Sequence, residues 1–442
     1  MNRSTIKSIY NPHQTKETLG ETKFLKRQNE RIEYRLVKVF RLVFILFYIV
    51  GIELPISPKR RKNRYPRTHR RDVRVHRILS YCRKCPKYFV LIIFFVIVTE
   101  MVWDIINLED KRTAATYFLL IVFTLILLIS IHKSRRTMFQ MTQMLSEVFK
   151  CFPRYNLNLV RYLSHALLVF SVIVSVYMAI VFNFHSTSLT YTEKRKFCEN
   201  NVVTDFLNLQ SYCFVTFQTV GCLTQAVGSI LFSLFSVFYS LVCILVQVLL
   251  SHLLNKINKA NSSEELHKPL FLFAIISRIM NCLEDTFSSS VFLETVMSMV
   301  GMFRAGYIVA FLSTVRLDYL PQLLFGIVGF VHQLLIIISA SSANEKAALT
   351  MKSLSCRIPE SETDLRFKLR RISGEHKSLS VWKIYVLDRS LVVTSVGTLV
   401  TYGMLIGTIG KDHHWRWDMG AQLYPRYQVH LHDMEESKLT RN

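Results

Sequence analysis

Long apolar runs separated by polar, basic blocks dominate the 442-residue chain. A helix needs about 20 mostly apolar residues to cross the hydrocarbon core of a bilayer. Six runs reach that length, and a further crossing falls inside a longer apolar region. The pattern therefore predicts an all-α membrane protein whose seven transmembrane helices lie at 88–106, 114–131, 162–184, 225–250, 287–312, 319–341 and 390–410.

The uncharged region 206–250 is too long for one simple span. As a straight helix it would reach about 67 Å, roughly twice the thickness of the hydrocarbon core. Charge decides how often it crosses, because cytoplasmic loops of membrane proteins collect Lys and Arg. The predicted loops 132–161 and 343–389 are both strongly basic, so both are expected in the cytosol. An even number of crossings must separate them, which allows this region only one.

The same charge rule orients the chain. The basic segment 1–87 is expected in the cytosol, and seven crossings then place the tail 411–442 outside the cell. The predicted loop 251–286 has balanced charges and says nothing about its side. Within the amino-terminal segment, an apolar stretch of about half a span predicts a short interfacial or re-entrant helix at 42–57.

Composition supports a membrane protein over the other classes. The net charge is +24, which in a soluble protein would suggest a nucleic-acid partner. Here the excess lies in the predicted cytoplasmic segments, where lipid headgroups are the expected partner, and we expect no nucleic acid. Cys82 and Cys85 have metal-ligand spacing but no second pair nearby, so we expect no metal site. No catalytic or phosphate-binding motif is found, and neither an enzyme nor a cofactor is expected.

Seven spans invite comparison with G-protein-coupled receptors, but the predicted orientation is the opposite of theirs. The third span is not followed by Asp-Arg-Tyr, and the seventh lacks Asn-Pro-x-x-Tyr. Transporters usually show an internal repeat, which an odd number of spans does not suggest. A G-protein-coupled receptor with unusual motifs and a non-conducting accessory subunit of a receptor complex both remain as alternatives.

The last span carries a family resemblance. The sequence from 386 to 402, which ends in Thr401 and Tyr402, resembles the carboxyl end of arthropod (insect-type) gustatory receptors. That family has Thr-Tyr, five mostly hydrophobic residues and then Gln-Phe, whereas this chain has Thr408 and Ile409 at the final two places. The resemblance also covers the seven-span plan, the cytoplasmic amino terminus and the basic segment before the last span.

The resemblance implies a chemosensory receptor in the plasma membrane that acts as a ligand-gated cation channel. It implies four subunits, identical or mixed with related receptors, around a pore lined by the seventh helix. The segment 342–389 would then form a cytoplasmic anchor between subunits, and a small-molecule tastant or metabolite would bind in the outer half of the helix bundle. The sequence does not identify that ligand.

Helical geometry assigns candidate pore residues within the last span. Positions i, i+4 and i+7 share one face of a helix, so Thr401, Leu405 and Thr408 align. With the resemblance, this face is expected to line the pore, with Leu405 as the hydrophobic constriction and Thr408 as a polar ring beside it. Tyr402 lies off this face and is expected to pack against a neighbouring helix.

Polar residues inside the spans are candidates for a ligand pocket, because such residues are costly in lipid and usually face protein or water. Arg304, His332 and Gln333 are the candidates, with interface anchoring as the alternative for Arg304 and simple packing for the other two. Glu294 stands ten residues before Arg304, about 15 Å along a helix, so the two cannot pair. A further set recurs at helical spacing and predicts a packing stripe, with a pocket wall as the alternative: Phe232, Phe235, Phe238 and Tyr239.

Overall fold

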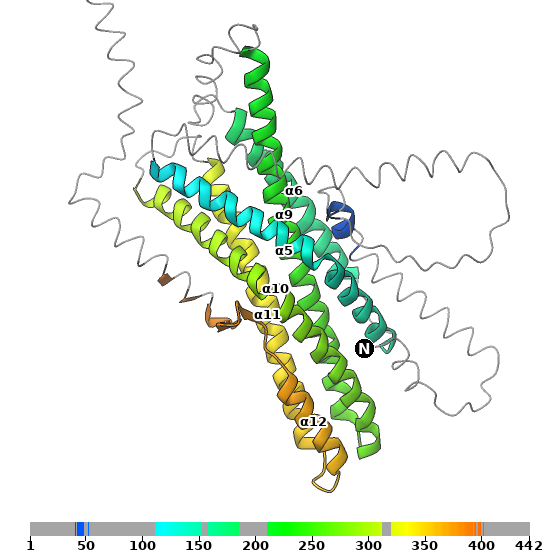
Figure 1. Ribbon diagram of the computed structural model, residues 1–442. Helices are drawn as coiled ribbons and strands as arrows, with labels where there is room; N and C mark the ends of the chain where they lie inside the picture. Colours follow the sequence, from blue (N-terminus) through cyan, green and yellow to red (C-terminus); the bar gives the residue numbers. More distant parts are fainter. Residues whose placement is uncertain are drawn as a thin grey trace, which may run out of the picture.

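The protein folds as a bundle of long helices. The computed structural model describes residues 40, 42–47, 52, 111–152, 158–184, 210–311, 320–391, 393–394, 397–398 and 401. Its helices are α5 (Lys111–Lys150), α6 (Asn158–Phe184), α9 (Gln210–Lys259), α10 (Ser263–Phe311), α11 (Leu320–Arg357) and α12 (Thr363–Glu375) (Figure 1). A two-stranded antiparallel hairpin follows, formed by β1 (Ser380–Val381) and β2 (Tyr385–Val386). The predicted first span and the tail 411–442 lie outside the described residues.

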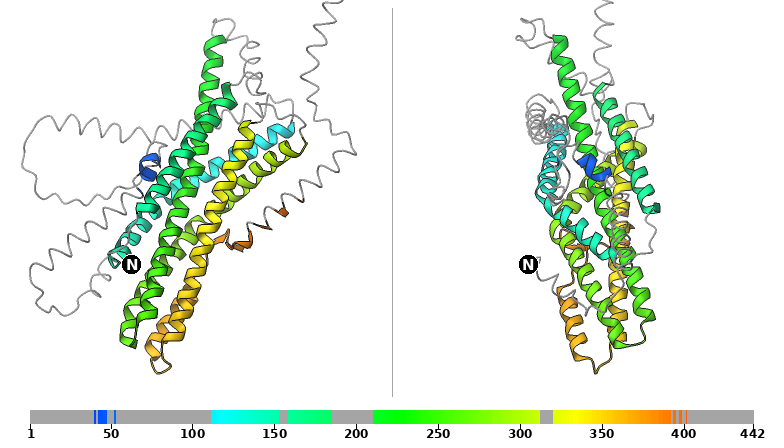
Figure 2. Two further views of the ribbon diagram at one scale, coloured as in Figure 1. Left: turned by 180° about the vertical axis from the view of Figure 1, so that it is seen from behind. Right: turned by 90° about the vertical axis from the view of Figure 1, so that its right-hand side faces the viewer.

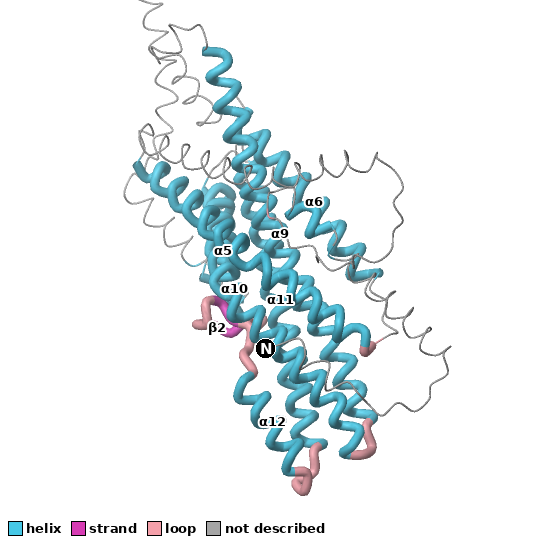
Figure 3. The backbone as a smooth tube through the Cα atoms, turned by 45° about the vertical axis from the view of Figure 1, so that its right-hand side comes forward, coloured by secondary structure: helices cyan, strands magenta, loops and turns pink. Residues whose placement is uncertain are grey.

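Three long helices form the frame of the bundle. Helix α11 packs along both α9 and α10, α6 lies against α9, and α5 lies obliquely across α10 (Figure 2). Helix α12 packs where the ends of α10 and α11 come together, and Figure 3 shows the hairpin beside α10. Among the described residues, four helices are long and apolar enough to cross a membrane: α6, α9, α10 and α11.

The surface of α6 shows which side of the bundle faces lipid. Polar side chains at helical spacing, Ser164, Ser171 and Ser175, are buried against the other helices. Large aliphatic and aromatic side chains point away from the bundle and are exposed: Leu163, Val169, Phe170, Ile173, Val176, Tyr177 and Ile180. A helix of a soluble protein shows the reverse pattern, with its apolar stripe turned inward. Outward apolar residues and inward hydroxyls are what a bilayer requires.

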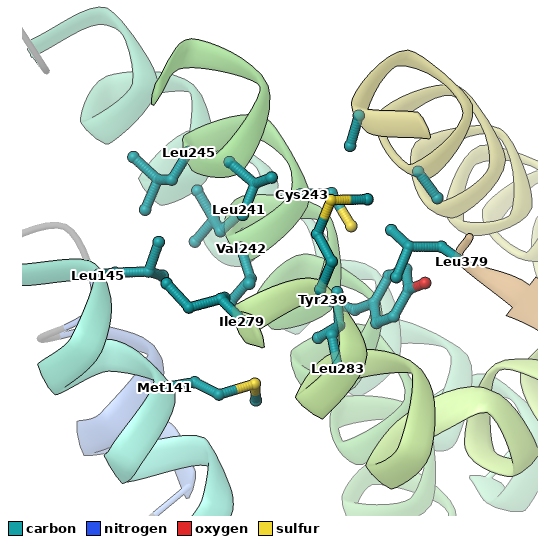
Figure 4. Packing of buried hydrophobic residues seen from close by; sticks show 14 of the residues in the cluster. Met141, Leu145, Tyr239, Leu241, Val242, Cys243, Leu245, Ile279, Leu283 and Leu379 are labelled. Carbon is teal, nitrogen blue, oxygen red and sulfur yellow. The ribbon is translucent and has the colours of Figure 1, made fainter. Parts of the chain in front are cut away.

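A continuous apolar core joins the helices. Figure 4 shows Met141 and Leu145 of α5 together with Val242 of α9 and Ile279 of α10 within this core. The predicted aromatic stripe of α9 contributes Phe235, Phe238 and Tyr239, all buried, so packing is the correct interpretation for these three. Phe232 is only partly buried, and its different position is described with the site.

The short amino-terminal helix packs on the bundle. Within the predicted segment 42–57, residues 42–47 are helical, and the Ile52 N–H donates to the Phe47 carbonyl at 2.7 Å. Phe40 and Phe47 are fully buried, with their ring centroids 5.8 Å and 6.5 Å from that of Phe238. The apolar face of this short helix thus lies against α9, and its predicted interfacial or re-entrant position stays a prediction.

Two segments expected as loops are helical. Helix α5 continues to Lys150 through the predicted loop 132–161, and α9 and α10 together fill most of 251–286. Ser262 and Glu265 cap the start of α10. The Glu265 N–H lies 3.4 Å from Ser262 Oγ, and Glu265 Oε2 accepts from the Asn261 N–H at 3.0 Å. This arrangement resembles a capping box, which satisfies the free amides at a helix start.

From Gln210 onward, the region 206–250 belongs to one continuous helix, α9, rather than to two helices. The 50 residues of α9 reach about 75 Å at 1.5 Å per residue. That is longer than a hydrocarbon core is thick, and the single crossing with an extension stays a prediction.

Glycines allow α10 and α11 to approach closely. A Cβ on Gly326 would collide with the Ala305 side chain and lie 2.9 Å from the Gly301 carbonyl oxygen. A Cβ on Gly301 would lie 2.9 Å from the Phe325 ring, and one on Gly329 would lie 3.3 Å from the Ser298 Cα. Small residues at such positions are typical of helix pairs in membranes, where close backbone contact replaces the hydrophobic driving force.

Candidate functional site

A small cavity lies where α6, α9, α10 and α11 meet, with a volume of about 50 Å³. All four helices that are apolar enough to cross a membrane contribute to it. The lining is mixed, with one carboxylate and one imidazole among hydroxyl and apolar groups. Its residues are Val174, Ser175, Met178, Ser229, Phe232, Ser233, Glu294, Met297, Ser298, Phe325, Val328, Gly329 and His332.

Glu294 is the carboxylate of this cavity, and it is 1% exposed. Its Oε1 accepts a hydrogen bond from the Ser236 hydroxyl of α9 at 2.6 Å. Its other oxygen, Oε2, is buried and has no hydrogen-bond partner among the described residues. A buried carboxylate that is only half satisfied is costly, and an ionisable residue within a membrane-capable helix is a candidate functional residue.

His332 on α11 faces Glu294 across the cavity. Its Nδ1 lies 3.8 Å from Glu294 Oε1, which is too long for a hydrogen bond. Its Nε2 lies 3.5 Å from the Ser171 hydroxyl of α6, at the limit of contact. The imidazole is therefore buried between two polar neighbours that it holds only loosely, and a modest movement of α11 would tighten or break either contact.

Hydroxyl and apolar groups divide the rest of the lining. Ser233 donates to the Ser229 carbonyl at 3.0 Å, which leaves the Ser233 oxygen able to accept from an occupant. Phe232 and Phe325 contribute aromatic surface from α9 and α11. The alternative interpretation of the aromatic stripe thus holds for Phe232, which lines the cavity while its three companions pack in the core.

Of the three predicted pocket residues, His332, Gln333 and Arg304, the structure places one in the cavity lining. His332 lines the cavity, whereas the neighbouring Gln333 is buried but does not line it. Arg304 belongs to α10, ten residues beyond Glu294, and its side chain lies outside the described part of the chain. The structure instead adds Glu294 and the serines. Sequence analysis noted that Glu294 is costly in a span but did not find its partner Ser236. The serine hydroxyls within the apolar run of α9 were the sequence signal that could have pointed to that partner.

The predicted pore residues fall mostly beyond the described part of the chain. Thr401 is helical and exposed, and its hydroxyl donates to the Gly397 carbonyl at 2.8 Å. Leu405, Thr408 and Tyr402 lie outside the described residues. Thr394 and Thr398 are also exposed and bond back to the carbonyl four residues earlier, at 3.0 and 2.8 Å. Thr394 and Thr398 lie on the same face of the helix as Thr401. This threonine face therefore begins at Thr394, two turns before Thr401.

The hairpin connects the cavity helices to the last helix. Glu284 of α10 accepts both the N–H and the hydroxyl of Ser380, the former at 2.7 Å. Asn344 of α11 accepts the Leu379 N–H at 2.9 Å and donates to the carbonyls of Leu379 and Leu387 at 3.1 and 3.2 Å. The last helix begins three residues after Leu387. The two helices that carry Glu294 and His332 therefore hold the segment from which the last helix starts.

The turn of the hairpin is held in a strained conformation. Trp382 and Lys383 have φ of 50° and 59°, a left-handed region that non-glycine residues rarely adopt. The Trp382 ring packs on Phe292 of α10 with centroids 4.6 Å apart, and the backbone N–H of Trp382 donates to the Ser288 carbonyl at 3.2 Å. Strain of this kind persists only where neighbouring contacts fix the backbone. Here α10 makes these contacts, through Phe292 and Ser288, within two turns of Glu294.

The fold is similar to that of a known receptor. The chain resembles the structure of the insect olfactory receptor OR5 from Machilis hrabei, with a TM-score of 0.54 and 11% sequence identity. The match covers 85% of this chain and 98% of that chain. No family model and no curated protein sequence matches the chain. The likeness is one of architecture, and it extends over nearly the whole of the olfactory receptor.

Proposed function

We propose that the protein is a chemosensory receptor of the plasma membrane that acts as a ligand-gated cation channel. The observation that carries the proposal is the fold, which matches 98% of an insect olfactory receptor chain. The resemblance of the last span to arthropod gustatory receptors supports it independently, because it rests on residues rather than on architecture. Together they favour an insect-type chemoreceptor of the gustatory class.

The pore of the proposed channel is the threonine face of the last helix. Thr394, Thr398 and Thr401 are exposed in the single chain and align at helical spacing with Leu405 and Thr408. Four copies of this face around a common axis would give rings of hydroxyl groups, which suit the passage of hydrated cations, and one ring of leucines. A hydrophobic ring closes a pore by excluding water.

The proposed gating route runs from the cavity through the hairpin. From Glu294 to Glu284 is ten residues of α10, about 15 Å along the helix, and from His332 to Asn344 is about 18 Å of α11. A ligand that draws α10 and α11 together or apart would move the two anchors of the hairpin relative to each other. Because the last helix starts beside Leu387, this motion would tilt or rotate the pore face.

Excised membrane patches test this function. Cells expressing the protein are patched, and a panel of sugars, bitter compounds and volatiles is applied in solutions that lack GTP. A cation current in these patches supports a channel, whereas current that requires intact G-protein signalling supports the alternative of a G-protein-coupled receptor. Silence of the protein alone, with current when a related receptor is co-expressed, supports a non-conducting accessory subunit.

A further inference from the structure

We propose that the cavity between α6, α9, α10 and α11 binds a small organic amine in its protonated form, with the Glu294 carboxylate as the anchor. This inference rests on the proposed function, because it assigns a ligand class to the same cavity. It is carried by the unsatisfied oxygen of Glu294, by the absence of Lys and Arg from the described cavity lining, and by the apolar groups beside that oxygen.

The first step concerns the missing hydrogen-bond donor. Glu294 lines the cavity, its Oε1 is satisfied by Ser236, and its buried Oε2 has no partner within the described part of the chain. Leaving a buried charged group without a donor costs more than leaving a neutral one. A ligand that brings an N–H or O–H into the cavity would supply that donor, so the site favours ligands that donate.

The second step concerns charge. The residues that line the cavity include neither Lys nor Arg, and His332 is 3.8 Å from Glu294 Oε1, beyond hydrogen-bonding distance. The carboxylate therefore has no Lys or Arg partner among the described lining residues, and its one basic neighbour, His332, makes no hydrogen bond with it. An ammonium group supplies a positive charge and three donors, and hydrogen bonds between two charged groups are the strong ones. A neutral alcohol supplies one donor and no charge, and a carboxylate ligand would be repelled.

The third step concerns size and shape. About 10–15 Å³ accommodates one water, so a cavity of about 50 Å³ suits an organic molecule of only a few heavy atoms. Its apolar walls suit a short alkyl chain, and an aromatic face from Phe232 or Phe325 can stabilise an adjacent cation. The Ser175 and Ser298 hydroxyls can accept the remaining N–H groups. The fitting ligand class is a short alkylamine.

The test measures binding directly, without relying on channel activity. Purified full-length protein in lipid nanodiscs is titrated with n-propylamine, 1-propanol and propionate at pH 7.5, and Kd is measured by calorimetry. We expect n-propylamine to bind at least about tenfold more tightly than 1-propanol, since a charged hydrogen bond gives about ten- to a hundredfold in affinity. Propionate should not bind.

Two variants locate the site. Glu294→Gln keeps the size of the side chain but removes its charge, and it should weaken n-propylamine binding by about ten- to a hundredfold while 1-propanol is unaffected. Val328→Phe leaves the carboxylate in place and fills the cavity, so it should abolish binding of both compounds. The matched control is Glu147→Gln on the exposed side of α5, which should leave every Kd unchanged.

The outcomes separate this inference from the proposed function. Equal affinity for amine and alcohol, or full amine binding by Glu294→Gln or by Val328→Phe, would overturn the amine site. Should Glu294→Gln fail to fold, Val328→Phe still decides the matter. Amine binding without any current in patches supports the site and counts against the channel. Current evoked by other compounds, together with no amine binding, leaves the channel standing and removes this inference.

Discussion

At the scale of single residues, burial and hydrogen bonding explain positions that hydropathy alone does not. Sequence analysis predicted that Glu294 and His332 are costly within spans and must face protein or water. It could not predict that they face each other, because the rotation of α10 against α11 depends on packing contributed by both helices. The role of Asn344 on α11 was not predicted, since its three hydrogen bonds join segments that lie 35 to 43 residues apart in the sequence.

Asn344→Leu should loosen the hairpin. The substitution has similar volume but leaves the Leu379 N–H and the carbonyls of Leu379 and Leu387 without a partner, at a cost of about 1–3 kcal/mol for each group that stays buried. We expect faster limited trypsin cleavage after the exposed Lys383, measured on purified protein by mass spectrometry. The exposed Asn258→Leu is the control, and equal cleavage in both variants would contradict the clamp.

His376, at the end of α12, gives the stability of the protein a pH dependence. Burial against Phe273 lowers the pKa of its imidazole below the ordinary value of 6.5, and its Nδ1 lies 2.9 Å from the Ser277 hydroxyl. The unfolded chain therefore binds this proton more readily than the folded one, so stability is full above pH 6.5 and falls as pH drops below it. Thermal unfolding in detergent at pH 7.5 and 5.5 checks this.

The control for that measurement is His376→Gln, which keeps a hydrogen-bonding group for Ser277 but cannot titrate in this range. The unfolding temperature of the native protein should fall more between pH 7.5 and 5.5 than that of the variant. Equal shifts would mean that other groups cause the pH dependence.

At the scale of elements, most of the predicted spans correspond to helices, but their ends were missed. Hydropathy detects only the part of a helix that is apolar enough for lipid, whereas α5 and α10 continue as amphipathic helices that bury Met138, Leu145 and Phe273. Such extensions have polar sequences and were therefore assigned to loops. The capping residues around Ser262 were the local signal that could have placed the start of α10 correctly.

Gly326→Ala should weaken the packing of α10 on α11. The added methyl collides with Ala305 and meets the Gly301 carbonyl at 2.9 Å, so the helices must separate or shift. Overpacking of this kind costs about 1–3 kcal/mol, seen as a lower unfolding temperature in detergent. Gly306→Ala is the matched control on α10, because a Cβ there meets nothing within 4 Å and Ala favours the helix. Destabilisation by both variants alike would show that close approach is not the cause.

At the scale of the whole molecule, the predicted seven-span topology is the arrangement that fits the distribution of charge along the sequence. The structure describes four membrane-capable helices, and the match to the olfactory receptor covers 85% of the chain. Ligand identity could not be predicted from the sequence, because the cavity is assembled from four helices at once. Its mixed lining becomes visible only when their rotations are known.

Topology can be tested on intact cells. Asn261 lies in a glycosylation sequon at the α9–α10 turn, for which the predicted order of membrane crossings expects a cytosolic position. It should carry no glycan when the protein is expressed in eukaryotic cells, as checked by glycosidase digestion and mass spectrometry. An epitope added after Asn442 should be stained without permeabilisation. A glycan on Asn261, or an epitope stained only in permeabilised cells, would reverse the orientation and restore the G-protein-coupled alternative.

The central claim is that the last helix lines a cation pore, and the conductance of Leu405→Ser in planar lipid bilayers tests it most directly. The purified variant is reconstituted without any ligand, beside the native protein and Ile406→Ser, a position that helical spacing puts off the predicted pore face. Serine in place of leucine should wet the constriction. We predict a cation-selective leak from Leu405→Ser, and none from the native protein or Ile406→Ser. Silence of all three, or equal leak from both variants, would contradict the account.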